Sequence, residues 1–169
     1  MRETLKLFNG QLPNIRFSMI MGVVVCQSMS DESVCFSPPD FVRHEVETRG
    51  LKGMGPCIPS RLVMVYSLRS FRYLQRLTHG RFAECWYSRQ RPLHVGEYNG
   101  KPVSLLCSWI GSSAAGMMLE EAIAFGACEI VEVGVAGGIQ PFLKPGDIFV
   151  VTGAMRDEGT SCHYFPADV

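Results

Sequence analysis

One stretch, residues 130–152, constrains the fold more than any other part of the chain. Its sequence is IVEVGVAGGIQPFLKPGDIFVVT. Residues 130–133 are mostly β-branched and predict a strand that stops at Gly134, after which Gly137 and Gly138 allow a turn that side chains would obstruct. A Lys-Pro-Gly-Asp turn signal then precedes a second predicted strand, residues 148–152. The stretch therefore predicts two strands joined by a loop that contains glycines.

A glycine loop after a strand is a candidate ligand-binding edge. In open α/β sheets, ligands bind at the carboxyl ends of the strands, and backbone N–H groups in a glycine loop suit anionic or polyhydroxylated molecules. No helix start follows this loop, as a dinucleotide or P-loop fingerprint would require. A tight structural turn therefore stays open as the alternative to a ligand site.

The segments upstream alternate between strand and helix patterns. Residues 62–66 predict a buried strand, and Ser67 predicts the cap of a helix over residues 70–78. Asn99-Gly100 is a strong hairpin signal, and it joins predicted strands at 93–98 and 102–107. Further helices are predicted at 41–47 and at 114–125, the second one capped by Ser112 or Ser113 and closed by Gly126. Glu120 and Glu121 fit a solvated face of that helix. This alternation predicts an α/β domain whose strands 62–66, 102–107, 130–133 and 148–152 are neighbours.

The composition narrows the class of partner and the compartment. With 169 residues, 47% hydrophobic content and no formal net charge, the chain suits one globular domain and has no excess positive field for nucleic acid or an acidic membrane surface. Its seven cysteines form no C-x-x-C pair and have no histidine at ligand spacing, so we expect neither a metal site nor a disulfide framework. An odd number of cysteines favours a reducing compartment and therefore a cytoplasmic location.

The first residues do not fit the rest of the chain. Residues 17–26 are an apolar run with the length of a signal peptide, but no small-x-small cleavage site follows it. The run is too short to span a bilayer. A disordered or mistranslated upstream extension is the alternative. We therefore divide the chain into an N-terminal extension and loop, 1–57, partly disordered, and a domain, 58–169.

Three linked motifs resemble a known family. They are Gly134-Val-Ala-Gly-Gly-Ile-Gln-Pro141, then Lys-Pro-Gly-Asp147-Ile, then Arg156-Asp-Glu-Gly-Thr-Ser161 with His163 and Tyr164. In this order they resemble the nucleoside phosphorylase family, and the uridine phosphorylase branch most, over residues 60–169. The resemblance implies a three-layer α/β sandwich with a mixed central sheet, incomplete at its C-terminus, and homo-oligomers built from dimers.

The resemblance also implies where ligands bind. Val135, Ala136 and Gly137 would face the phosphate and the sugar, and Arg156 would approach the pocket. Ser112 lies in a loop that lines the nucleoside pocket in the family, although capping a helix would also explain this serine. No catalytic residue, metal or cofactor is assigned, and phosphate serves as co-substrate.

The phosphate ligands are the weak point of the resemblance. Where the family has a Gly-Asp-Pro-x-Arg loop, this chain has Ser-Leu-Arg-Ser-Phe-Arg, so Arg69 is a substitute ligand or only a solvated side chain. Arg89 and Arg91 precede the hairpin, and Arg89 aligns best with a family arginine that reaches a neighbour's phosphate across a dimer interface. A surface arginine in a loop is the alternative. Glu132 replaces a family arginine, and a carboxylate about 4 Å from phosphate repels it by roughly 4 kcal/mol at an effective dielectric of 20. Glu132 would instead make a structural ion pair or accept hydrogen bonds from sugar hydroxyls.

Three functions stay open at this point. The first is phosphorolysis of a uridine or purine nucleoside, and the second is hydrolysis by a nucleosidase, which does not need phosphate ligands. The third is a non-catalytic remnant, because the family continues past the matched region with a Glu-Met-Glu type motif that grips the ribose. Catalysis here depends on positioning and electrostatics, so we expect the 169-residue chain alone to be inactive.

Overall fold

The computed structural model describes residues 18–25, 36–51, 57–155 and 157–164. The helices are α1 (Pro38–Thr48), α2 (Leu68–Leu77) and α3 (Ser112–Ala124), with a short 3₁₀ helix η1 (Thr160–His163). The strands are β1 (Ser18–Val25), β2 (Arg61–Val65), β3 (Arg81–Phe82), β4 (Leu93–Tyr98), β5 (Lys101–Cys107), β6 (Glu129–Ala136) and β7 (Ile148–Val150). The predicted elements are therefore present, with shifts of a few residues at their ends.

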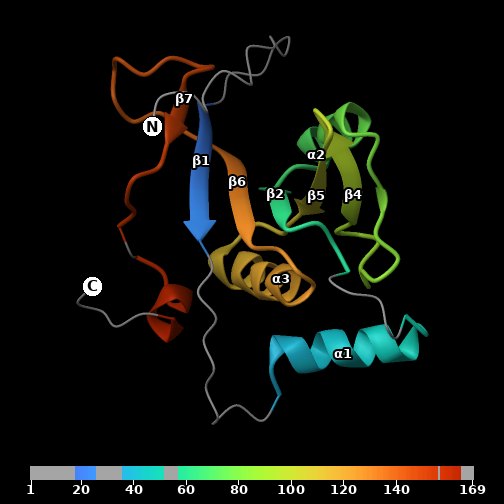
Figure 1. Ribbon diagram of the computed structural model, residues 1–169. Coiled ribbons are helices and arrows are strands. Elements are labelled where there is room, and N and C mark those ends of the chain that lie inside the picture. Colours follow the sequence, from blue (N-terminus) through green and yellow to red (C-terminus); the bar gives the residue numbers. More distant parts are fainter. Residues whose placement is uncertain (1–17, 26–35, 52–56, 156, 165–169) are drawn as a thin grey trace.

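The strands form one mixed sheet in the order β3-β4-β5-β2-β6-β1-β7 (Figure 1). Strand β2 pairs in parallel with both β5 and β6, whereas β4 runs antiparallel to β5 and β1 antiparallel to β6. Val65 is in register with both Cys107 and Val133. The carboxyl ends of the three central strands consequently meet at one edge of the sheet.

Helices cover the two faces of this sheet, which confirms the predicted three-layer architecture. Because side chains alternate along a strand, Leu62 and Met64 of β2 pack in one cluster and Val65 packs in the other. The first cluster includes Met118 and Ala122 of α3, and the second includes Phe71 and Leu74 of α2. Alternation in β2 thus directs the two helices to opposite faces.

Two local predictions are confirmed by backbone geometry. Asn99 and Gly100 have positive φ angles of 50° and 73°, as a tight hairpin turn between β4 and β5 requires. The hydroxyl of Ser67 accepts a hydrogen bond of 3.2 Å from the backbone N–H of Arg69, so this serine caps α2. Gly126, with φ of 125°, follows the end of α3.

The predicted serine cap of α3 is wrong. The residue that precedes the helix is Gly111, with φ of 114°, and Ser112 and Ser113 are the first helical residues. This backbone conformation favours glycine, which explains why glycine rather than serine stands there. The two hydroxyls are consequently available to other partners.

The predicted end of the strand at Gly134 is also wrong. Strand β6 continues through Ala136, because β1 pairs with it from Val25↔Glu129 to Ser18↔Ala136. At Gly137 an added Cβ would meet no atom within 4 Å, so this glycine is not required by crowding. At Gly138 an added Cβ would lie 3.2 Å from Cβ of Leu143, so only the second glycine of the pair avoids a close contact.

Strands β6 and β7 are not neighbours, contrary to the prediction, because β1 lies between them (Figure 1). The apolar run that we considered as a signal peptide forms this strand. Helix α1, also from the predicted extension, packs on α3. The expectations for residues 1–17 and 26–35 lie outside the described part of the chain.

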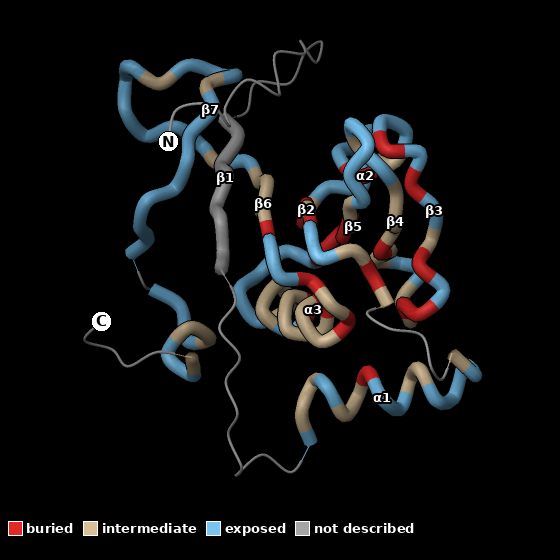
Figure 2. The backbone as a smooth tube through the Cα atoms, viewed as in Figure 1, coloured by how far each residue is buried: buried red, intermediate tan, exposed pale blue. Residues whose placement is uncertain are grey.

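Burial is uneven across the sheet. Figure 2 shows buried residues concentrated at β2, β4, β5 and one side of α3, whereas the chain after β6 is mostly exposed. Ile139, Phe142 and Met155 are 95%, 72% and 94% exposed. None of the helices in the described ranges has both the length and the apolar character needed to cross a membrane.

Candidate functional site at the carboxyl edge of the sheet

The candidate site consists of the residues that directly follow the three central parallel strands. Tyr66 and Ser67 follow β2, the segment from Ser108 to Gly111 follows β5, and residues 134–138 form the end of β6 and the start of its loop. The backbone N–H of Ser108 donates a hydrogen bond of 2.8 Å to the carbonyl oxygen of Val65, which ties the second segment to the first. We call this region the carboxyl edge.

Tyr66 and Glu132 form a polar pair at this edge. The Tyr66 hydroxyl donates a hydrogen bond of 3.1 Å to Oε2 of Glu132. Burial raises the pKa of Tyr66 far above its ordinary value, and the adjacent carboxylate of Glu132 raises it further. A Cβ at Gly134 would lie 3.7 Å from the Tyr66 ring, so this ring lies along β6 beside the glycine.

The pair bears on the two interpretations of Glu132, an ion pair or an acceptor of further hydrogen bonds. Within the described part of the chain, Glu132 makes no ion pair with an arginine, so the expected structural ion pair is not found. Its partner is a neutral hydroxyl, and Glu132 remains partly exposed. The carboxylate is therefore able to accept further hydrogen bonds at the carboxyl edge.

A second polar cluster joins α3 to the segment around η1. The hydroxyl of Thr160 lies 3.1 Å from Oγ of Ser112 and 2.7 Å from Oγ of Ser113. The carboxylate of Glu158 accepts hydrogen bonds from the backbone N–H groups of Thr160 and Ser161, at 2.9 and 3.0 Å. Hydrogen bonds from the side chains of Ser161 and Ser112 lower the pKa of Glu158 to about 2, so Glu158 is a carboxylate at neutral pH. We call these residues the hydroxyl cluster.

The same segment is held to α3 at a second point. The hydroxyl of Tyr164 donates a hydrogen bond of 2.8 Å to Oε1 of Glu120 and lies 3.3 Å from where a Cβ of Gly116 would be. Glu121, one position later, accepts a hydrogen bond from the Tyr87 hydroxyl. The prediction that Glu120 and Glu121 only face solvent is therefore wrong, because tyrosines from two distant segments pair with them.

The predicted substrate ligands are partly brought together. Val135, Ala136 and Gly137 lie at the end of β6, where Val135 is 65% exposed, and Ser112 lies in the hydroxyl cluster at the start of α3. Arg156 lies outside the described residues. Val135, Ala136 and Gly137 thus lie at the carboxyl edge, whereas Ser112 is joined to the segment that follows Arg156.

The predicted phosphate ligands are separated. Arg69 is exposed in the first turn of α2, at the carboxyl end of β2. The guanidinium of Arg89 instead lies over the ring of Phe82 on β3, 4.4 Å from its centroid. Since β3 is at the far end of the sheet order from β6, Arg89 and Glu132 are not in one site within a single chain.

Sequence reasoning passed over one arginine at this edge. The guanidinium of Arg91 lies over the ring of Trp109, 3.7 Å from its centroid, and its Nη1 is 3.6 Å from Sγ of Cys107. Arg89 aligns better with the family than Arg91 does, so the resemblance favoured Arg89. No local sequence signal pairs Arg91 with Trp109, because their contact depends on how β4 lies beside β5.

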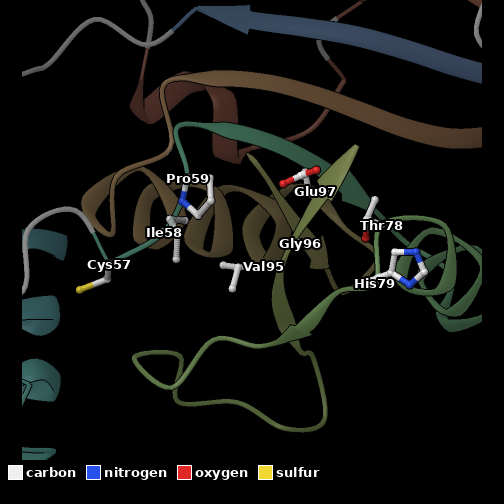
Figure 3. Close-up of a pocket in the computed structure, with 8 residues that line it drawn as sticks. All are labelled: Cys57, Ile58, Pro59, Thr78, His79, Val95, Gly96 and Glu97. Carbon is white, nitrogen blue, oxygen red and sulfur yellow. The ribbon is translucent and has the colours of Figure 1, made fainter. Parts of the chain in front are cut away.

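A separate groove lies away from the carboxyl edge. It has a volume of about 650 Å³ and is lined by residues before β2, at the end of α2 and on β4 (Figure 3). Because Cys57, Ile58 and Pro59 precede β2, this groove lies beside the amino end of that strand. The Tyr66–Glu132 pair and the hydroxyl cluster do not line it.

The described residues contain no group of three or more histidine, cysteine, aspartate or glutamate side chains that could hold a metal. The five described cysteines are free, with Cys85 and Cys107 buried and Cys128 and Cys162 exposed. The polar groups described at the carboxyl edge and in the hydroxyl cluster are hydroxyls, carboxylates, backbone groups and arginines.

Comparisons with known proteins agree with this geometry. The family model described as the Phosphorylase superfamily matches residues 66–169, from the Tyr66 position through the hydroxyl cluster. A uridine phosphorylase from Thermococcus kodakarensis is 37% identical over 81 residues, covering 48% of this chain and 29% of that protein. A uridine phosphorylase from Treponema pallidum is 33% identical over 100 residues, covering 59% and 38% respectively.

A third relative is a guanosine phosphorylase from Halorubrum lacusprofundi. It is 30% identical over 77 residues, covering 46% of this chain and 32% of that protein. The chain thus spans 29% to 38% of the length of these three curated relatives.

Proposed function

The chain belongs to the phosphorylase superfamily, and from this premise we propose that it takes part in cleaving the N-glycosidic bond of a nucleoside, with phosphate as the nucleophile. One observation carries the proposal. The hydroxyl cluster joins the first turn of α3 to the segment around η1, 47 residues apart, beside the carboxyl ends of parallel strands. Two segments of the matched region thereby meet where α/β sheets bind ligands.

Phosphorolysis requires protein groups that position the reactants and stabilise charge, and it requires no covalent bond to the protein. Phosphate attacks the anomeric carbon as the base departs, through a state in which the sugar carries positive charge. Carboxylates near the sugar stabilise that charge, and hydroxyls and backbone N–H groups hold the sugar in place. Glu132 is suited to the first task, and the exposed or partly exposed residues Val135 to Gly137 with Ser112 are suited to the second.

Phosphate needs cations, and two arginines are candidates to supply them. Arg69 is exposed at the start of α2, and Arg91 lies at the end of β5. Arg89 would contribute only from a second subunit, as the resemblance implies, because within one chain it lies over Phe82. We therefore propose homo-oligomers built from dimers. We also propose that the protein acts in the cytoplasm, with uridine or a purine nucleoside as substrate.

Hydrolysis is the second candidate, and a specific observation favours it. Glu132 carries negative charge where the resemblance places an arginine, and its partner is the neutral hydroxyl of Tyr66. A carboxylate repels phosphate but is able to accept a hydrogen bond from an attacking water. A nucleosidase would therefore tolerate this substitution better than a phosphorylase.

The test measures release of base from uridine, inosine and methylthioadenosine, with and without phosphate. Phosphorolysis predicts release that requires phosphate and yields the sugar 1-phosphate. Hydrolysis predicts equal release without phosphate, and the non-catalytic alternative predicts no release in either condition. Release that is independent of phosphate and yields the free sugar, unphosphorylated, would overturn the first proposal and support the second.

A further inference from the structure

The two tryptophans of the chain occupy opposite environments. Trp86 has no exposed surface, and its indole N–H donates a hydrogen bond of 2.8 Å to the carbonyl oxygen of Arg91. Trp109, in contrast, is 43% exposed. Its neighbour Ile110 is 84% exposed, so an apolar aromatic ring and an aliphatic side chain lie next to each other in solvent.

Arg91 fixes the orientation of the Trp109 ring. The guanidinium lies 3.7 Å from the ring centroid, while its Nη1 contacts Sγ of Cys107 at 3.6 Å. Its Nε is buried and has no hydrogen-bond partner within the described residues. One face of the indole is therefore in contact with a cation, and 43% of Trp109 remains exposed to solvent. We call this exposed surface the free face.

The position of Trp109 connects it with the candidate site. The residue stands in the segment that links β5 to α3, between Ser108 and Gly111. The backbone N–H of Ser108 bonds to the carbonyl of Val65 at 2.8 Å, and its hydroxyl donates to the carbonyl oxygen of Trp109 at 3.0 Å. Trp109 is thus attached to the edge at which Tyr66 follows β2.

These observations indicate which kind of ligand group the Trp109 surface would bind. A flat apolar face with a cation behind it attracts planar heteroaromatic rings, whereas phosphate and ribose have no flat face to offer. Stacking on an aromatic side chain accepts pyrimidines and purines alike. We propose that the free face of Trp109 is the stacking surface for the base of the nucleoside, an inference that rests on the function proposed above.

The burial difference supplies a selective optical test. Because Trp86 is fully buried, a collisional quencher such as acrylamide acts mainly on Trp109. The chain is titrated with uridine, inosine, uracil, hypoxanthine, ribose and inorganic phosphate. We expect nucleosides and free bases to change the emission and to protect Trp109 from acrylamide, while ribose and phosphate have no effect.

Variants at two positions of equal exposure make the test quantitative. Trp109→Ala is expected to weaken binding of the base, measured by calorimetry, roughly ten- to hundredfold. Trp109→Phe should retain most of the affinity, because it keeps an aromatic face. Tyr73→Ala is the matched control, since Tyr73 is also 43% exposed but lies on α2, and its affinity should be unchanged.

The results that overturn the inference differ from those that overturn the function. Calorimetric binding of base with unchanged Trp109 emission, or equal affinity in Trp109→Ala, would refute the stacking surface while leaving phosphorolysis intact. Protection of Trp109 that follows protein concentration instead of base would refute it in favour of a subunit interface. Base-dependent protection without any phosphate-dependent release would keep the stacking surface and agree with the expectation that the 169-residue chain alone is inactive. Absence of base binding would refute the stacking surface and count against the proposed function too.

Discussion

The hydroxyl of Tyr66 donates a hydrogen bond of 3.1 Å to Oε2 of Glu132, joining residues 66 positions apart at the carboxyl ends of two adjacent parallel strands. The bond arises from register, since Val65 is opposite Val133 and Met64 is opposite Glu132. It keeps the carboxylate beside Gly134, on the face of the sheet that α3 covers. Glu132 therefore places a carboxylate at the carboxyl edge, where the family resemblance implies an arginine.

Tyr66→Phe should lower the free energy of unfolding by about 1 to 2 kcal/mol, because Glu132 loses its hydrogen-bond donor in a partly buried position. The melting temperature should fall by a few degrees for a domain of this size. Tyr73→Phe, on the exposed side of α2, is the control and should leave the melting temperature unchanged. Equal melting temperatures for the two variants would mean that the bond contributes nothing to stability.

Gly96→Ala should destabilise the fold strongly. A Cβ at this position would lie 2.5 Å from the carbonyl oxygen of Thr78, which also accepts a hydrogen bond of 2.9 Å from the backbone N–H of Glu97. Since backbone must move, we expect a loss of about 2 kcal/mol or more, measured by denaturant unfolding. Gly137→Ala, where nothing lies within 4 Å, should change stability by less than about 0.5 kcal/mol. The reverse ranking would contradict the described backbone.

Glu121→Gln should stabilise the protein at neutral pH. Burial raises the pKa of the Glu121 carboxyl above its ordinary 4.5, while the hydrogen bond from Tyr87 lowers it and the nearby Glu120 and Glu45 raise it. The native state therefore favours the protonated form, so this contribution is fully present below pH 4.5 and is lost as pH rises through the raised pKa. Glutamine keeps an acceptor for the Tyr87 hydroxyl without the charge.

The measurement is melting temperature against pH from 4 to 8. The variant should gain over the wild-type chain as pH rises through this window, because only the wild type then carries an unfavourable buried charge. Glu97→Gln, on an exposed position of β4, removes one charge without this environment and serves as the control. A constant difference between Glu121→Gln and the wild type at every pH would refute the role of protonation.

Local signals predicted the parts of the fold that local chemistry decides. Asn99-Gly100 required positive φ angles and formed the hairpin, and Ser67 capped α2. Pairings between distant segments were not predictable. The end of β6 depends on β1, a segment that resembled a signal peptide. The serines at the start of α3 depend on Thr160, because a hydroxyl that suits a cap also suits a partner 47 residues away.

The candidate site shows the same difference between local signals and contacts across distant segments. The glycine motif predicted that Val135 to Gly137 follow a central strand, but β6 itself extends through Ala136. The partner of Glu132 could not be foreseen, because strand register decides which side chains meet across 66 residues. Likewise, only the three-dimensional structure shows that Arg91 contacts Trp109, whereas Arg89 contacts Phe82.

Self-association should follow from the exposed apolar residues after β6. Ile139 and Phe142 are 95% and 72% exposed, and exposed apolar side chains that occur together in one loop favour an interface. We expect dimers or larger species in light scattering at micromolar concentration, and a shift towards monomer in the double variant Ile139→Glu with Phe142→Glu. Leu77→Glu, at 40% exposure on α2, is the control. A stable monomer of the unmodified chain would refute this prediction.

Glu132→Arg addresses the charge at the carboxyl edge directly. A carboxylate 4 Å from a phosphate is repelled by about 4 kcal/mol at an effective dielectric of 20, and an arginine would turn repulsion into attraction. Because Glu132 is partly exposed, solvent screening reduces both values, and we expect a gain in phosphate affinity of at least about tenfold. The variant also removes the acceptor of the Tyr66 hydroxyl, so its melting temperature is recorded alongside.

The comparison that isolates the site is Glu97→Arg, which makes the same charge change on β4 beside the separate groove at the amino end of β2. Phosphate binding is measured by calorimetry for both variants and the wild type, at low and at physiological salt, because a general change in net charge weakens with salt more than a local contact does. A gain in phosphate affinity that is confined to Glu132→Arg would place the anion beside Glu132. It would also explain a weak dependence of base release on phosphate in the natural sequence. Equal gains in both variants would reflect net charge alone, and unchanged affinity in Glu132→Arg would move the anion away from β6, leaving Arg69 and Arg91 as the residues to change next.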